Sequence, residues 1–230
     1  MLFTIADVHL SGSVNKPMNV FGEKWDSYEG RLSENWKAAV GPSDTVVMPG
    51  DISWGMTMEE AMADFSFLDA LPGRKLIGKG NHDYWWTSVS KMKKALDDAG
   101  IRTIDFLYNN AYRVEELAVC GTKGYLWDTE ETEVQNAKIM NRELARLELS
   151  LAAGKKLGGE SVVFLHYPPV TAVFKNDAYI DTMLKYGVTQ CYYGHIHGAG
   201  HRSAFNGKYR GIEFSLISAD YIEFYPVFIK

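Results

Sequence analysis

The 230-residue sequence has only two cysteines and no excess of positive charge. Cys120 and Cys191 lie 71 positions apart, and neither belongs to a C-x-x-C pair, which argues against zinc-finger and thioredoxin-like motifs. Both cysteines lie in apolar runs, so we expect buried free thiols and a reducing compartment. Lysine and arginine number 24 against 29 aspartates and glutamates, a net charge of −5. This balance argues against nucleic acid or an anionic membrane as the partner.

Long apolar runs are missing as well. No stretch approaches the roughly 18 residues that a membrane span requires. The first residues, Met1–Asp7, lack the basic region and the long apolar stretch of a secretory signal. We therefore expect a cytoplasmic protein without a membrane partner. Repeats, low-complexity tracts and linker-like stretches are also absent, so residues 1–230 are predicted to form a single domain.

The sequence does contain a regular alternation of short apolar runs and amphipathic stretches. The runs at residues 2–6 and 45–48 are typical of buried strands, and apolar residues at helical spacing follow each run. This order favours parallel strands. Asn206-Gly207 is typical of a two-residue hairpin turn, and it is predicted to join antiparallel strands at 201–205 and 208–214. We expect an α/β (α+β) fold with mixed sheets.

Metal-binding types of side chain follow the predicted strands. The chain has six histidines, and five of them come directly after a strand, each close to Asp, Asn or Gly. The blocks are Asp7-Val8-His9, Gly50-Asp51, Gly80-Asn81-His82-Asp83, His166 and Gly194-His195-Ile196-His197. Ligands of α/β sheets collect at the carboxyl ends of the strands. We therefore expect the five blocks to converge on one site, where the glycines allow tight turns and close approach.

The residue types indicate which metals such a site would hold. Carboxylate, imidazole and amide oxygen suit manganese, iron or zinc, and the lack of thiolates argues against a structural zinc site. The candidate ligands, too many for one tetrahedral ion, are Asp7, His9, Asp51, Asn81, His166, His195 and His197. Two divalent ions fit if Asp51, which lies between the first and third blocks, bridges them. Paired ions can clamp the attacking and leaving oxygens of a displacement at phosphorus.

The five blocks, in this order, resemble the pattern of the calcineurin-like metallophosphoesterases over residues 7–197. The resemblance implies a four-layer αββα sandwich, with two mixed β-sheets flanked by helices. The implied ligands are Asp7, His9 and His197 for one ion and Asn81, His166 and His195 for the other, with Asp51 shared. A metal-bridging hydroxide would attack phosphorus. His82 would be the catalytic histidine, and Asp83 would fix its orientation and charge.

The resemblance leaves the substrate of this phosphohydrolase open. Ile52-Ser53-Trp54 follows Asp51, without the Asp-Arg-Gly of protein serine/threonine phosphatases, which argues against a phosphoprotein. We favour a small phosphodiester or nucleotide-type substrate; the alternatives are a phosphomonoester, a nucleic-acid end, and a non-catalytic scaffold.

The substrate selectivity of the site must then come from its loops. The candidate loops are residues 11–24, Tyr84-Trp85-Trp86, residues 121–128 with Lys123, Tyr125 and Trp127, and residues 170–177 with Lys175. A lysine could bind a distal phosphate and an aromatic ring could stack on a base, although Trp85 and Trp86 could equally pack in the core. His201 is expected at the surface.

Overall fold

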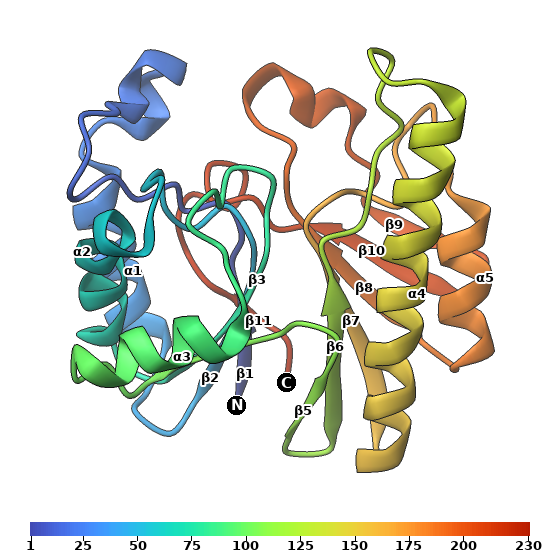
Figure 1. Ribbon diagram of the computed structural model, residues 1–230, viewed down its shortest axis with the longest axis horizontal. Helices are drawn as coiled ribbons and strands as arrows, with labels where there is room; N and C mark the ends of the chain where they lie inside the picture. Colours follow the sequence, from blue (N-terminus) through green and yellow to red (C-terminus); the bar gives the residue numbers. More distant parts are fainter.

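The computed structural model describes residues 1–230 as two β-sheets packed face to face, with helices on both outer faces (Figure 1). The first sheet contains, in spatial order, β11 (Val227–Phe228), β1 (Leu2–Thr4), β2 (Thr45–Pro49), β3 (Arg74–Gly78) and β4 (Ile104–Phe106). The second contains β5 (Ala111–Val114), β6 (Leu117–Thr122), β7 (Glu160–Leu165), β8 (Gln190–Tyr193), β10 (Ile212–Leu216) and β9 (Gly207–Tyr209). The predicted sandwich of two mixed sheets is confirmed.

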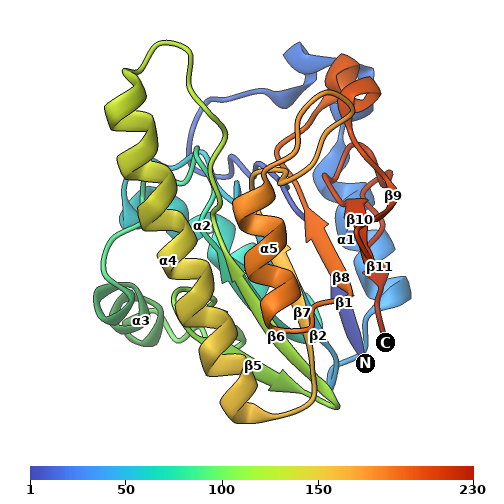
Figure 2. The same cartoon turned by 90° about the vertical axis from the view of Figure 1, so that its right-hand side faces the viewer.

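The helices divide between the two outer faces of the sandwich. The first sheet is covered by α1 (Tyr28–Ala39), α2 (Met58–Asp69) and α3 (Val89–Asp98). The second is covered by α4 (Glu133–Leu157) and α5 (Asp177–Lys185), which lie in front of its strands in Figure 2. In α1, the side chains of Tyr28, Leu32 and Trp36 recur every four residues and are buried, so one stripe of the helix faces the core.

The central strands are buried on both faces, which explains why β2 and β7 are apolar along most of their length. In β2, Val46 and Met48 belong to the cluster beneath the helices, whereas Val47 packs between the sheets with Phe164 of β7. Successive residues of a strand point to opposite faces, so this division follows from the strand geometry. Strands β1, β2 and β3 are parallel, as are β6, β7 and β8. The carboxyl ends of each set therefore meet at one edge.

Two irregular segments lie beyond these carboxyl ends. The chain between β1 and α1 contains the short 3-10 helices η1 (Met18–Phe21) and η2 (Glu23–Trp25), drawn in blue in Figure 1. After β8 comes the 3-10 helix η3 (Gly198–Ser203). These segments border the edge at which the polar blocks meet.

The hairpin prediction near the C-terminus is wrong in its position. The turn between β9 and β10 is formed by Arg210 and Gly211, both with positive φ (50° and 93°), and not by Asn206-Gly207. The Asn206 Oδ1 instead accepts a hydrogen bond from the Leu216 backbone N–H at 2.8 Å. This tertiary contact fixes Asn206 outside the turn, and η3 replaces the strand expected at 201–205.

Several smaller predictions can also be compared with the structure. Cys120 and Cys191 are buried free thiols, as expected, and burial raises the pKa of Cys120 to about 11. Trp85 is buried against Phe65, so it packs in the core, whereas Tyr84 is 57% exposed. None of the helices combines the length and the apolar character that crossing a membrane requires.

Candidate metal centre and active site

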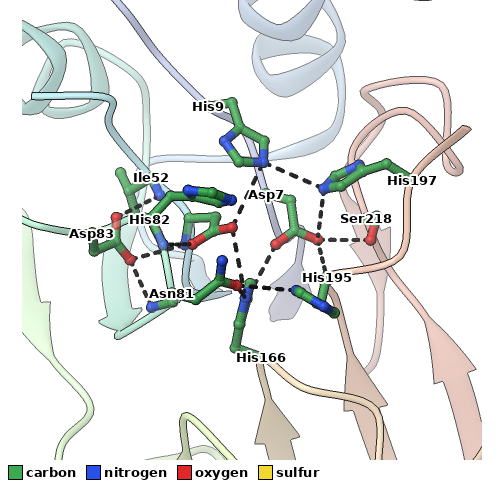
Figure 3. A network of polar contacts seen from close by, with 12 residues as sticks. Asp7, His9, Ile52, Asn81, His82, Asp83, His166, His195, His197 and Ser218 are labelled. Atoms are coloured by element: carbon green, nitrogen blue, oxygen red, sulfur yellow. Dashed lines mark hydrogen bonds and ion pairs between the residues drawn. The ribbon is translucent and has the colours of Figure 1, made fainter. Parts of the chain in front are cut away.

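The structure brings all seven predicted ligands together at the carboxyl ends of the strands. Figure 3 labels six of them, all except Asp51. Asp7 and His9 follow β1, Asp51 follows β2 and Asn81 follows β3, so the first sheet supplies two carboxylates, an amide and an imidazole. The second sheet supplies imidazoles only, from His166 after β7 and from His195 and His197 after β8. The site therefore lies between the two sheets, and neither sheet could form it alone.

The backbone at this site is unusual. Asp7, His9, Asp51 and His195 all adopt left-handed conformations, with φ of 58°, 46°, 53° and 73°. Non-glycine residues in this region cost of order 1 kcal/mol each and tend to occur at functional sites. The local turns thus aim these side chains at a common point at the expense of backbone stability.

Glycines at two positions make room for the carboxylates, as predicted. A Cβ at Gly194 would lie 2.5 Å from the Asp7 Oδ2. A Cβ at Gly80 would overlap the Asp51 carboxylate itself. Only glycine allows the backbone to come this close, so both glycines are required by the packing of the charged side chains.

One group of side chains is centred on His9 and His197. The Nε2 atoms of His9 and His197 lie 3.3 Å apart. The Asp51 Oδ2 lies 3.7 Å from the His9 Nε2, and the Asp7 Oδ2 lies 3.9 Å from the His197 Nε2. Two imidazole nitrogens and two carboxylates thus converge, which is a donor set that divalent transition metals prefer.

A second group lies beside the first. The Asn81 Oδ1 is 2.5 Å from the His166 Nε2 and 3.0 Å from the His195 Nδ1. The Asp51 Oδ2 is 3.6 Å from the same His166 nitrogen. A single oxygen of Asp51 therefore lies at similar distances from a nitrogen of each group.

Asp7 and Asp51 are both almost completely buried, and their only ion-pair partners are histidines. Burial, together with the charge of Asp7, raises the pKa of Asp51. The Asp7 Oδ1 and the His166 Nδ1 are buried without a hydrogen bond, although they lie 3.2 Å apart. Buried charges and unpaired polar atoms are costly unless a further partner compensates them, and a cation bound here would do so. The residues therefore fit a metal ion.

The protonation states of His9 and His195 agree with this interpretation. Burial lowers the pKa of His9 and of His195 to about 3, so both imidazoles are neutral near pH 7. Neutral imidazole is the form that binds metals. Burial also acts on His166, but the charges of Asp51 and Asp7 outweigh it and raise the pKa of that ring.

His82 is partly buried at the rim of the site, where it lines a cavity of about 230 Å³ together with His9 and His197. Its backbone N–H donates to the Asp51 Oδ1 at 2.8 Å. Its ring lies with its centroid 4.6 Å from that of Trp54, and Trp54 in turn stacks on His9 at 5.0 Å. Burial and the charge of His166 lower the pKa of His82. A neutral imidazole therefore faces the cavity.

The structure places Asp83 differently from the expectation. Its carboxylate accepts hydrogen bonds from the backbone N–H groups of Gly80, Asp51 and Ile52, at 2.7, 2.9 and 2.8 Å, and from the Trp85 indole at 3.1 Å. None of its hydrogen bonds goes to the His82 ring, because its oxygens are already taken by these donors. Asp83 thus ties the loop after β2 to the loop after β3, and burial raises its pKa to about 6.

Sequence reasoning missed two polar residues after β10. The Ser218 hydroxyl donates to the Asp7 Oδ2 at 2.6 Å. The buried Asp220 carboxylate lies 2.8 Å from the His197 Nδ1 and 3.3 Å from the His201 Nε2, and it accepts from the Gly198 N–H at 3.0 Å. His201, expected at the surface, is therefore partly buried. Both missed residues follow a strand, so they form a sixth block that the same pattern could have identified.

Comparisons with known proteins agree with this geometry. A family model described as calcineurin-like phosphoesterase matches residues 2–199. The Gene 66 protein of Mycobacterium phage L5 is 31% identical over 78 residues, which cover 34% of this chain and only 37% of that protein. A protein of unknown function from Aquifex aeolicus has a similar solved structure, with a TM-score of 0.54 at 16% identity over 99% of this chain and 94% of that one. The last likeness shows the fold alone.

The family match extends over most of the chain, and the chain belongs to the calcineurin-like phosphoesterase family. Membership, together with the buried cluster of Asp7, Asp51 and His166, supports a metal-dependent phosphoesterase with divalent metal ions as its cofactor. The ligand oxygens and nitrogens of this cluster all lie within 4.8 Å of one another.

Proposed function

We propose that this protein is a metal-dependent phosphohydrolase that uses two divalent ions. Asp7, His9 and His197 would hold the first ion, and Asn81, His166 and His195 the second. The observation that carries this proposal is the place of Asp51, whose Oδ2 lies 3.7 Å from a nitrogen of one group and 3.6 Å from a nitrogen of the other. One carboxylate oxygen in that position suits a ligand shared by two ions.

The donor set favours manganese, iron or zinc, because it combines carboxylate, imidazole and amide oxygen without thiolate. Such paired ions, when bound, supply Lewis acidity toward a phosphoryl group and lower the pKa of water. The chain's own residues then have three tasks. They neutralise and fix the ions, orient the phosphate ester, and assist the departure of the leaving oxygen.

His82 is proposed as the residue that assists the leaving group or the phosphoryl oxygens. It belongs to neither ligand group, yet its ring lines the same cavity as His9 and His197. A neutral imidazole can donate its ring N–H to a phosphoryl oxygen or to the leaving oxygen. Asp83 is proposed to act indirectly, because its hydrogen bonds hold the loops that carry Asp51 and Asn81.

We further propose a small phosphodiester or nucleotide-type substrate, as the cavities next to His82 are of small-molecule size. The test is hydrolysis of bis-p-nitrophenyl phosphate and p-nitrophenyl phosphate by metal-free protein reloaded with manganese, iron or zinc. We expect activity only with metal, and faster hydrolysis of the diester.

The same assay tests the role of His82. His82→Ala should bind the same amount of metal as the wild type and lose about 10²-fold or more in kcat. Full activity of the metal-free protein in chelator would contradict the metal dependence. An unchanged kcat in His82→Ala would contradict only the role of the histidine.

A further inference from the structure

Two neighbouring cavities open beside His82. The first, of about 230 Å³, reaches the ligands His9 and His197, and the second, of about 610 Å³, extends away from them toward Lys16 and Tyr84. Phe21, Trp54 and His82 line both cavities, so the two adjoin one another at these residues, and we treat them together as one binding space. An ester whose phosphorus lies near His82 has room there for one of its substituents.

Several aromatic side chains line this space. Phe21 comes from η1, Trp54 from the loop after β2, and Tyr84 from the loop after β3. Phe21 is 59% exposed and Tyr84 is 57% exposed, although both line a cavity. Aromatic faces that remain open to solvent beside a polar site are typical of surfaces on which planar ligands stack.

Trp54 is held rigidly between the metal site and this space. Its indole N–H donates to the Met18 Sδ at 3.1 Å, and its ring stacks on the His9 imidazole with an interplanar angle of 22°. The loop before α1 is thereby tied to the site. Phe21 lies three residues beyond Met18, at the other end of η1.

Lys16 provides a positive charge in the same space. Its Nζ lies 4.1 Å from the centroid of the Trp54 ring, and no carboxylate is within ion-pair distance of it. By contrast, Lys24 at the other end of the loop is paired with Glu223 at 2.6 Å. A cation that lacks an acidic partner and lines a cavity next to a phosphoesterase site is available to an anionic group of the ligand.

We propose that this space binds the nucleoside part of a nucleotide-type phosphate ester, with the base against Phe21 and Tyr84 and an anionic oxygen at Lys16. The proposal rests on the proposed function of the metal site and names its substrate class. An alkyl chain would gain nothing from Lys16, Asn15 and Glu60, which also line the second cavity. A sugar phosphate would leave the exposed aromatic faces uncovered.

The proposal can be tested with two phosphodiesters that share a leaving group. Thymidine 5′-(p-nitrophenyl phosphate) carries a nucleoside, and methyl p-nitrophenyl phosphate does not. For the metal-loaded wild type we expect kcat/KM to be at least about tenfold higher for the nucleoside ester. Phe21→Ala should lower kcat/KM for the nucleoside ester more than for the methyl ester, and so remove most of this advantage. Lys16→Ala should lower kcat/KM for both esters, because both carry the anionic phosphoryl oxygen that Lys16 would contact.

Val20→Ala is the matched control, because Val20 lies beside Phe21 in η1, is 71% exposed and lines neither cavity. It should keep the full preference. Equal kcat/KM for the two esters in the wild type, or an equal loss on both in Phe21→Ala, would overturn the inference while leaving the phosphohydrolase intact.

A binding measurement separates the inference from the proposed function. Calorimetric titration of the metal-loaded protein with thymidine 5′-phosphate and with inorganic phosphate requires no turnover. Tighter binding of the nucleotide, lost in Phe21→Ala, supports the nucleoside site even if neither ester is hydrolysed. Equal affinities for nucleotide and phosphate would refute it.

Discussion

The middles of the strands and the loops that follow them obey opposite physical rules in this protein. Between the sheets, Val47, Val162 and Phe164 are buried, apolar and in regular strand geometry. A few residues further along, Asp51 and His166 are equally buried but polar, and Asp51 has a left-handed backbone. The strand middles stabilise the fold, and the segments beyond them use part of that stability to hold charges together in a nearly dry site. Substitutions in the two regions should therefore have separable effects.

The largest effect is expected at the shared carboxylate. Asp51→Asn should lower kcat by on the order of 10³-fold or more, because the neutral amide weakens both ion sites at once. The metal-free variant should be at least as stable as the wild type, since a buried charge beside Asp7 is removed. Steady-state kinetics, metal analysis and urea unfolding measure the three quantities. Loss of just one ion per chain would contradict the bridging role.

A substitution in the middle of β7 should lower stability and leave kcat nearly unchanged. Phe164 stacks on Tyr192 between the sheets and is 1% exposed, so Phe164→Ala should lower the free energy of unfolding by about 3–5 kcal/mol. Below its unfolding transition, kcat should stay within about threefold of the wild type. Phe164→Leu removes less side-chain volume, so it serves as a milder variant if Phe164→Ala does not fold. A loss of kcat comparable with that of Asp51→Asn, in protein shown to be folded, would break the distinction between the regions.

Lys75 is an exception among the strand residues, because it is a fully buried lysine in β3. It tests the cost of a buried charge within a strand. Its amine donates to the Leu71 carbonyl and to the Thr103 hydroxyl, and burial lowers its pKa from 10.5 to about 8. Between those two pH values the unfolded chain binds more protons than the folded protein, so stability rises with pH through this window.

Relative to Lys75→Met, the wild type should gain roughly 3 kcal/mol in the free energy of unfolding between pH 7 and pH 10.5. Urea unfolding of both proteins across this range measures the difference, and titrations common to both cancel. Parallel curves for the two proteins would show that the Lys75 amine keeps its ordinary pKa.

The smallest effect is expected at a residue that contacts a ligand and would not bind the metal itself. Asp220 lies 2.8 Å from the Nδ1 of His197 and can accept a hydrogen bond from it, so Asp220→Asn should weaken metal binding by about 10- to 100-fold. Asp177→Asn, at an exposed aspartate paired with Arg210 at 3.5 Å, is the control. Competition with a chelator measures the affinity. Equal metal affinity of Asp220→Asn and the wild type would show that the contact does not orient His197.

Sequence reasoning predicted the strands and helices well, and it predicted the contacts between the loops poorly. The period of the apolar residues in β2 and α1 and the position of each polar block are local properties, so they could be inferred without a structure. The hairpin turn could not be placed, because Asn206 is held by a distant partner, the backbone of Leu216. The contact of Asp220 with His197 and the hydrogen-bond partners of Asp83 were not predicted either, since both depend on how loops from different strands approach one another.

The amino-acid sequence by itself determined the alternation of strands and helices, the two buried cysteines, and the set of side chains that could hold metal. These follow from periodicity, residue type and order along the chain. Only the tertiary structure decided that an oxygen of Asp51 lies between two groups of nitrogens, that Asp83 holds loops together, and that Lys16 and Phe21 border His82. Such distances depend on the packing of the two sheets, because each sheet carries only part of the site.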